Sequence, residues 1–155
     1  AGASLMAVEE TKGGLFQSPL SIRTQGQGLH EITSELQALV QRSGVQTGLC
    51  NLFVQHTSCS LVIQENADPT ARADLESWMA RLAPENDPRY THTLEGTDDM
   101  PAHLRSAVTR TSEMIPITEG KLGLGTWQGV FLWEHRHAAH QRRLMVTVLA
   151  GNNTL

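Results

Sequence analysis

The sequence has little of what marks membrane, nucleic-acid-binding or disulfide-rich proteins. Its longest apolar runs, such as 145–150, are far shorter than the roughly 20 residues that span a bilayer. Lys and Arg total 12 against 16 Asp and Glu, and the net charge of −4 argues against general nucleic-acid binding, which needs clustered basic residues. With 155 residues, 39% of them hydrophobic, the chain fits one globular domain with a substantial core.

Cysteine is also scarce. Cys50 and Cys59 lie nine residues apart without a CxxC pair, so a disulfide would require them to face each other across a turn, and two buried free thiols in a cytosolic protein are favoured instead. The sequence shows no charged start followed by a long apolar segment, which is the pattern of a secretory signal. We therefore expect a cytoplasmic protein. Residues 1–5 ahead of Met6 are expected to be an added remnant, which leaves 6–155 as a single domain.

Hydrophobic periodicity predicts three helices set between pairs of strands. The expected helices cover 29–42, the segment from the N-cap Asp68 to Pro84, and 100–110. The expected strands cover 15–24, 47–55, 58–65, 115–118, 130–135 and 144–149. This order predicts a compact α+β domain with a mixed or mostly antiparallel sheet and about three helices, because a doubly wound parallel sheet needs regular alternation of strands and helices.

A glycine-rich run connects two of these strands. Gly120, Gly123 and Gly125 lead into Trp127 and Gln128, which offer a flat apolar ring and a two-way hydrogen-bonding amide. Both a loop that faces a ligand and a hairpin loop with a packed Trp fit this pattern.

Two further polar groups flank the strand expected at 58–65. On its N-terminal side, His56 and the hydroxyls that follow it offer an imidazole and small donors to an anion or a metal-bound ligand, or simply satisfy a turn. On its C-terminal side, helix capping accounts for Asp68 but leaves Glu65 and Asn66 unexplained.

The best metal candidate lies around the start of the third helix. Asp99 and His103 are four residues apart and therefore project from one face of a helix, and His92 can approach from the preceding loop. Imidazole and carboxylate ligands suit zinc or another divalent ion, whereas carboxylates with waters suit magnesium. Convergence of His56 with His92 and His103 would strengthen this prediction.

The last strand pair carries an acid and a basic cluster. Glu134 shares a strand face with Val130 and Leu132, and a carboxylate on an apolar face needs a partner or a function. The cluster formed by Arg136, Arg142 and Arg143 is interpreted as a solvated strand end.

Together these motifs resemble the YjbQ-like family, also called the secondary thiamine-phosphate synthase family. The motifs that carry the resemblance run in the family's order across nearly the whole chain: QHTSCS at 55–60, ENADP at 65–69, DMPAH at 99–103 and the run 112–128 ending in GTWQ. The resemblance implies a compact α+β homotrimer with a deep pocket and with His56, His92 and His103 near it as metal ligands. Pro101 departs from the pattern, because some members carry another His there.

The resemblance also implies an activity: condensation of hydroxymethylpyrimidine diphosphate with thiazole phosphate and release of pyrophosphate. A divalent metal, Mg or Zn, would handle the diphosphate beside Asp99 and His103, although the sequence lacks an obvious basic clamp for it. The residues expected to act in catalysis are His56, Glu65, Asp99, His103 and Glu134. Those expected to bind substrate are Ser58, Asn66, Gly125, Thr126, Trp127 and Gln128, with Trp127 stacking on a ring.

Two other functions remain open on the sequence. The first is a metal-dependent hydrolase of a small phosphorylated or acyl substrate, with Glu134 or Glu65 as the base. The second is a trimer that binds a small-molecule metabolite in the same pocket without turning it over.

Overall fold

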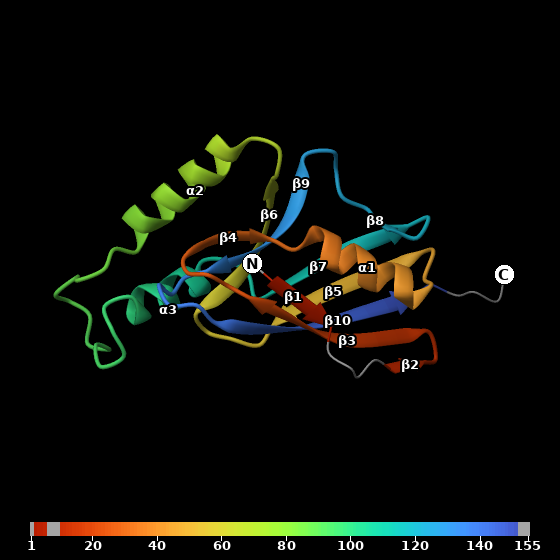
Figure 1. The fold of residues 1–155 in the computed structure, drawn as a ribbon, viewed down its shortest axis with the longest axis horizontal. Coiled ribbons are helices and arrows are strands. Elements are labelled where there is room, and N and C mark those ends of the chain that lie inside the picture. Colours follow the sequence, from red (N-terminus) through yellow and green to blue (C-terminus); the bar gives the residue numbers. More distant parts are fainter. Residues whose placement is uncertain (1, 6–9, 152–155) are drawn as a thin grey trace.

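The computed structural model describes residues 2–5 and 10–151, so the expected domain limits at Met6 and Leu155 lie outside the described residues. The described residues form two antiparallel sheets and three helices, arranged as in Figure 1, which confirms the predicted α+β class. The helices are α1 (Thr33–Ser43), α2 (Pro69–Leu82) and α3 (Asp99–Ala107). The strands are β1 (Gly2–Leu5), β2 (Glu10–Lys12), β3 (Leu15–Arg23), β4 (Gly28–Glu31), β5 (Gly48–Val54), β6 (Cys59–Glu65), β7 (Ser112–Thr118), β8 (Lys121–Leu122), β9 (Gln128–Glu134) and β10 (Gln141–Ala150).

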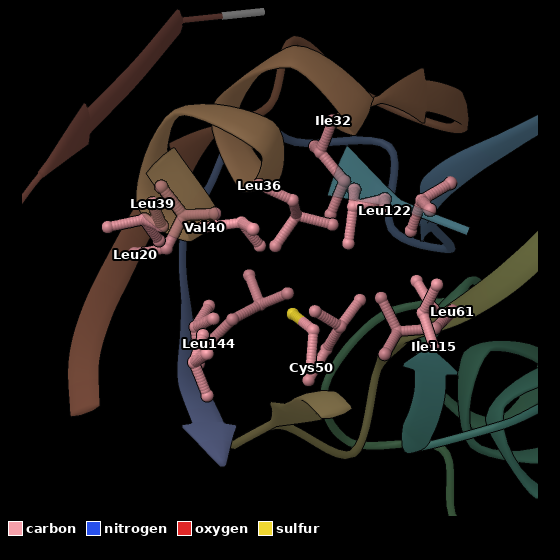
Figure 2. Close-up of a cluster of buried hydrophobic side chains, with 14 of the residues drawn as sticks. Leu20, Ile32, Leu36, Leu39, Val40, Cys50, Leu61, Ile115, Leu122 and Leu144 are labelled. Carbon is pink, nitrogen blue, oxygen red and sulfur yellow. The ribbon is translucent and has the colours of Figure 1, made fainter. Parts of the chain in front are cut away.

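The larger sheet holds the main core. Its strand order is β1-β3-β10-β5-β7-β8, with β2 pairing with β3, and α1 covers one of its faces. Figure 2 shows Leu36 of α1 above Cys50 and Leu144 of the sheet, all three fully buried. In β5 and β10 alternate residues point into this core, as the period of two in a pleated strand requires.

The smaller sheet has the order β4-β9-β6 and forms the frame for the functional residues. In the β6–β9 ladder, Cys59 pairs with Glu134 at one end and Glu65 pairs with Gln128 at the other. A second buried apolar cluster lies on this sheet and consists of Leu29, Met79, Phe131 and Trp133. Met79 of α2 belongs to this cluster and Leu75 of α2 packs against it, while most of α2 extends outward (Figure 1).

The first predicted helix was too long at its N-terminal end. Gly28–Glu31 forms β4 because its backbone pairs with β9, with Leu29 opposite Trp133, and α1 begins only at Thr33. The apolar stripe that predicted a helix is real from Ile32 onward. Gly44 ends α1 with a φ of 72°, a left-handed conformation that glycine adopts without strain.

The other two helices lie close to their predicted places. Asp68 caps α2 as expected, because its Oδ1 accepts a hydrogen bond from the backbone N of Thr70 at 2.9 Å. Helix α3 starts at Asp99 and ends at Ala107, three residues short of the expected Arg110, whose backbone instead bridges to Leu61 of β6. Among the described residues no helix is long and apolar enough to cross a membrane.

The fold bears on two further expectations, which concern the two cysteines and the N-terminal residues. Cys50 and Cys59 are buried free thiols, which confirms the favoured alternative to a disulfide. The backbone of Gly2–Leu5 pairs with β3, with Leu5 opposite Leu20. Whether residues 1–5 are an added remnant stays a prediction.

Candidate functional site

Four potential metal ligands converge where α3 begins. They are His92 and Glu95 from the loop before α3 and Asp99 and His103 from α3 itself, and one ligand atom from each lies within 4.8 Å of the others. The helical spacing that predicted a common face for Asp99 and His103 is therefore correct. Glu95 was missed, although its spacing of three and four residues from His92 and Asp99 was the signal that could have found it.

Asp99 is the centre of this cluster. Its side chain is nearly buried, and its Oδ2 lies 2.7 Å from Nε2 of His92 and 3.1 Å from Nε2 of His103. Burial alone raises the pKa of Asp99, but the hydrogen bonds with His92 and Glu95 and the charges of His103 and Arg136 outweigh burial and bring the pKa below its usual range. Asp99 is therefore a carboxylate that faces two imidazoles. The Glu95 carboxylate lies at the edge of the cluster, 3.6 Å from Nε2 of His92.

The backbone fixes the tautomer of His103. Its Nδ1 lies 3.0 Å from the carbonyl oxygen of Thr57, which only accepts hydrogen bonds, so Nδ1 carries the hydrogen. In a neutral imidazole, Nε2 then presents a lone pair to the Asp99 oxygen 3.1 Å away. Two acceptors at this distance repel each other unless a proton or a metal ion lies between them.

Arg136 holds the other oxygen of Asp99. Its Nη1 donates to Oδ1 of Asp99 at 2.7 Å, and its Nε donates to Oδ2 of Asp98 at 3.0 Å. The expectation that Arg136, Arg142 and Arg143 form a solvated strand end is therefore wrong for Arg136. No local sequence pattern could have revealed this contact, because Arg136 follows β9 and lies 37 residues from Asp99.

A cavity of about 230 Å³ opens beside the metal-ligand cluster. His92 belongs to both, so a molecule in the cavity would lie next to the ligands. The cavity is lined by Asn86, Asp87, Tyr90, His92, Thr93, Gly96, Thr97 and Met100.

Glu134 has a structural partner. It forms a bidentate ion pair with Arg142, accepts a hydrogen bond from Thr24 Oγ1 at 2.7 Å, and is buried like Arg142. Burial raises the pKa of Glu134, but the hydrogen bonds from Arg142 and Thr24 outweigh it and lower the pKa overall. Within one chain this carboxylate is enclosed and engaged by Arg142 and Thr24, and the catalytic role expected for Glu134 stays a prediction. Arg142 is likewise buried and not a solvated strand end.

His56 and Ser58 belong to this ion-pair network and not to the metal-ligand cluster. Nε2 of His56 accepts the backbone N–H of Arg143 at 2.8 Å, and Ser58 Oγ accepts from Arg142 at 3.0 Å. Burial and the charge of Arg142 lower the pKa of His56. The predicted set of three histidines is thus corrected: His92 and His103 converge, and Asp99 and Glu95 complete the group in place of His56.

The predicted substrate-binding residues around Trp127 lie at the other end of the β6–β9 ladder. Thr57, which touches His103, comes just before β6, whereas Glu65 ends it, and a seven-residue strand spans roughly 20 Å. Asn66 contacts Trp127 at that far end through a backbone hydrogen bond. Within one chain, therefore, Glu65, Asn66 and the loop Gly125, Thr126, Trp127 and Gln128 do not share a pocket with His103.

Local contacts explain much of this far region. Oε2 of Glu65 accepts the backbone N–H groups of Ala67 and Asp68, so it orders the approach to α2. Oε1 of Gln128 accepts the backbone N–H of Gly125 at 2.8 Å and closes the loop. Trp127 is 63% exposed, so it is not the packed Trp of an ordinary hairpin loop.

Comparison with known proteins places the chain in a family. The family model described as UPF0047 protein YjbQ-like matches residues 18–151. The chain belongs to the YjbQ-like family. Among curated YjbQ-like relatives, UPF0047 protein sll1880 of Synechocystis is 62% identical over 85% of this chain and 90% of that protein. UPF0047 protein YjbQ of Escherichia coli O157:H7 is 41% identical over 86% and 96%.

Solved structures of YjbQ-like proteins have the same fold. The conserved hypothetical protein TT1486 of Thermus thermophilus has a TM-score of 0.76 and 39% identity over 84% of this chain and 98% of that one. A protein of unknown function from Sulfolobus solfataricus has a TM-score of 0.78 and 25% identity over 88% and 99%. The resemblance seen in the sequence motifs is thereby confirmed.

The activity expected from the resemblance has to be corrected. The YjbQ-like relatives carry only the family designation UPF0047, and the Sulfolobus protein is described as having unknown function. These findings overturn the predicted thiamine-phosphate synthase function. The geometry agrees with the correction, since Trp127 is far from the His103 cluster and no Lys or Arg is among the residues that line the cavity beside His92.

Proposed function

We propose that this YjbQ-like protein is a metal-dependent hydrolase whose ion is held by His92, Asp99 and His103, with Glu95 beside them. The observation that carries the proposal is the placement of His103 Nε2 opposite Asp99 Oδ2, with the hydrogen of His103 fixed on Nδ1 by Thr57. A cation between these two atoms turns a repulsion into two bonds. An imidazole whose other nitrogen donates to a backbone carbonyl is also the usual arrangement of a histidine metal ligand.

The ligand set favours zinc or a similar transition ion over magnesium. Two imidazole nitrogens and one carboxylate are the ligands found in many catalytic zinc sites, which keep a further position open, whereas magnesium prefers oxygen ligands and waters. Asp99 is nearly buried while the Glu95 side chain is 65% exposed. Asp99 is therefore the fixed ligand, and Glu95 is free to move.

This difference gives the two carboxylates different tasks. A bound zinc ion acts as a Lewis acid that activates water for attack on a carbonyl group. The exposed Glu95 carboxylate beside the ion would be the group available as a general base and, once protonated, as a general acid. It replaces Glu134 and Glu65 as the candidate base, because both of those carboxylates are engaged elsewhere.

The cavity beside His92 favours a neutral acyl substrate over a phosphorylated one. The lining residues supply hydroxyl, amide and apolar groups, and the one carboxylate among them, Asp87, is paired with Arg89. No lining residue is Lys or Arg, the side chains that usually bind phosphate. We therefore infer an ester or amide of a small uncharged molecule as the substrate class.

The proposal is tested by zinc titration and by turnover. The purified protein is stripped with a chelator, titrated with zinc by calorimetry, and assayed on a panel of small esters, amides and phosphate esters. We expect one zinc per chain, loss of binding in Asp99→Asn and His103→Ala, and unchanged binding in the matched control His56→Ala. Zinc-dependent cleavage of an ester or amide supports the hydrolase. Zinc binding with ligand-induced thermal stabilisation but no cleavage would replace it with a metabolite-binding protein.

We also propose that the chain assembles as the homotrimer that the resemblance implies. The support is an exposed apolar surface on the outer face of the larger sheet, opposite α1, formed by Leu49, Phe53, Met114 and Leu149. Residues that pair directly across antiparallel strands share a face, and Leu49 pairs with Leu149. A contiguous apolar surface of this kind is typical of an interface.

The assembly is tested by size-exclusion chromatography with light scattering, which measures the mass of the eluting protein. We expect a trimer that Phe53→Asp converts to a smaller species, while Leu94→Asp, a substitution at a 98% exposed loop residue away from the sheet, leaves it intact. A monomeric parent protein would contradict the proposal.

A cytoplasmic location is proposed as well, and two buried free thiols support it.

A further inference from the structure

We propose that Arg136 is a positioning residue of the metal centre, and that it makes Asp99 a ligand through one oxygen only. The proposal rests on the proposed function, since it concerns the same metal centre. Nη1 of Arg136 occupies Oδ1 of Asp99 at 2.7 Å, so only Oδ2 remains to face His92 and His103. The guanidinium thus selects the ligand atom without touching the ion.

Arg136 also holds the segment that leads from Glu95 into α3. Its Nη2 donates to the backbone carbonyl of Glu95 at 3.0 Å, and its Nε donates to Oδ2 of Asp98 at 3.0 Å. The three guanidinium nitrogens therefore each bind a different residue of the segment from Glu95 to Asp99. A planar guanidinium can make three such bonds in fixed directions, whereas a lysine ammonium is a single point charge on a flexible stem.

The position of Arg136 is itself determined by the buried network of the smaller sheet. Its backbone N donates to Oε2 of Glu134 at 3.2 Å, and Glu134 is locked by Arg142 and Thr24. The backbone N of the next residue, His137, donates to Oδ2 of Asp98 at 2.8 Å. The ligand segment is thereby tied to the rigid end of β9 at several points, and this continuous set of hydrogen bonds is the physical basis for a preformed site.

The backbone of the ligand segment is shaped to fit the guanidinium. Gly96 has a φ of +105°, and a Cβ at this position would lie 3.1 Å from Oδ1 of Asp98 and 3.8 Å from Nη2 of Arg136. A side chain here would be strained by the backbone conformation and crowded by the Asp98 carboxylate. Glycine therefore lets the chain turn close around the Arg136–Asp98 pair.

The experiment compares zinc affinity and the absorption spectrum of the cobalt-substituted protein in Arg136→Lys and Arg136→Gln. Zinc affinity is measured by competition with a chromophoric chelator. Residues that orient metal ligands typically change affinity by about 10–100-fold when altered. We expect losses of that size in both variants, and a changed cobalt spectrum because Asp99 is released to bind through either oxygen. The control is Arg89→Lys, which alters an exposed arginine paired with Asp87 outside the cluster, and it should behave like the parent protein.

The possible results separate this role from the proposed function. Failure of the parent protein to bind zinc would refute both. Normal binding in the parent together with unchanged affinity in both Arg136 variants would refute the role of Arg136 alone. A weakened variant that keeps the parent cobalt spectrum, and whose metal-free form melts at a correspondingly lower temperature, would assign Arg136 a purely structural role and would also overturn the proposal. If Arg136→Gln fails to fold, Arg136→Lys, which keeps the charge, decides the question.

Discussion

The backbone N–H of Asn66 donates to the carbonyl of Trp127 at 3.0 Å, at the end of the smaller sheet opposite to His103. The chain thus has two separate polar regions, one around Trp127 and one around Asp99. The sequence motifs of both regions suggest a single pocket, but β6 separates them by its full length within one chain. Each region can therefore be altered without directly disturbing the other.

Replacement of Trp127 by Ala should leave zinc affinity unchanged. The side chain is 63% exposed, so we also expect a change in the free energy of unfolding of no more than about 0.5 kcal/mol. Calorimetric zinc titration and urea unfolding check the two expectations. A clear loss of zinc affinity would show that a neighbouring copy of the chain brings its Trp127 loop to the metal centre.

Removal of the charge of Glu134 should destabilise the fold strongly. Glu134→Gln leaves Arg142 as a buried cation without its carboxylate, and breaking a buried ion pair in this way costs about 3–5 kcal/mol. The matched control is Asp87→Asn, which breaks the ion pair with the largely exposed Arg89 and should cost less than about 1 kcal/mol. Urea denaturation measures both variants, and equal small losses would contradict the structural role of Glu134.

Loss of the cap of α2 should cost about 1 kcal/mol. In Asp68→Ala the backbone N of Thr70 loses its acceptor, whereas Asp68→Asn keeps an oxygen in the same place and serves as the control. Thermal unfolding monitored by circular dichroism compares the two. If both variants melt like the parent protein, α2 does not depend on this cap, and its contacts through Leu75 and Met79 would have to be sufficient.

Local patterns predicted most of the fold because local physics produced it. The N-cap at Asp68 and the apolar strands depend on neighbouring residues, and these predictions were confirmed. The start of the first helix was wrong because β4 forms only by pairing with β9, and the paired residues are 100 to 106 positions apart in the chain. A period of 3.6 in the sequence contains no information about that partner.

The candidate site was predictable to the same extent. The pair Asp99 and His103 follows from helical spacing, and His92 lies in the adjoining loop. The roles of Arg136 and Glu134 depend on contacts between segments 37 and 110 residues apart, so no motif could show them. His56 was expected among the ligands because a histidine in a polar motif resembles one, but within one chain its Nε2 accepts the backbone N–H of Arg143 and it lies outside the ligand cluster.

Acidification should weaken the fold through His135. This buried imidazole contacts Ser60 Oγ at 2.8 Å, and the groups that act on it electrostatically are Arg105, Glu134 and Arg142. Burial first, and then the charge of Arg105, lower the pKa of His135 from 6.5 to about 3. In the unfolded chain His135 therefore becomes protonated below pH 6.5, whereas in the folded chain it becomes protonated only near pH 3.

The sign follows from this difference in proton binding. Because the unfolded state holds more protons between pH 6.5 and about 3, the free energy of unfolding falls as the pH falls through that range. The slope due to this one group reaches at most about 1.4 kcal/mol per pH unit. Urea unfolding at several pH values should show a flatter dependence in His135→Gln than in His137→Gln, a control at a largely exposed histidine. Parallel curves for the two variants would mean that His135 is protonated in the folded protein, and the buried network around Ser60 would then have to accommodate a second positive charge beside Arg105.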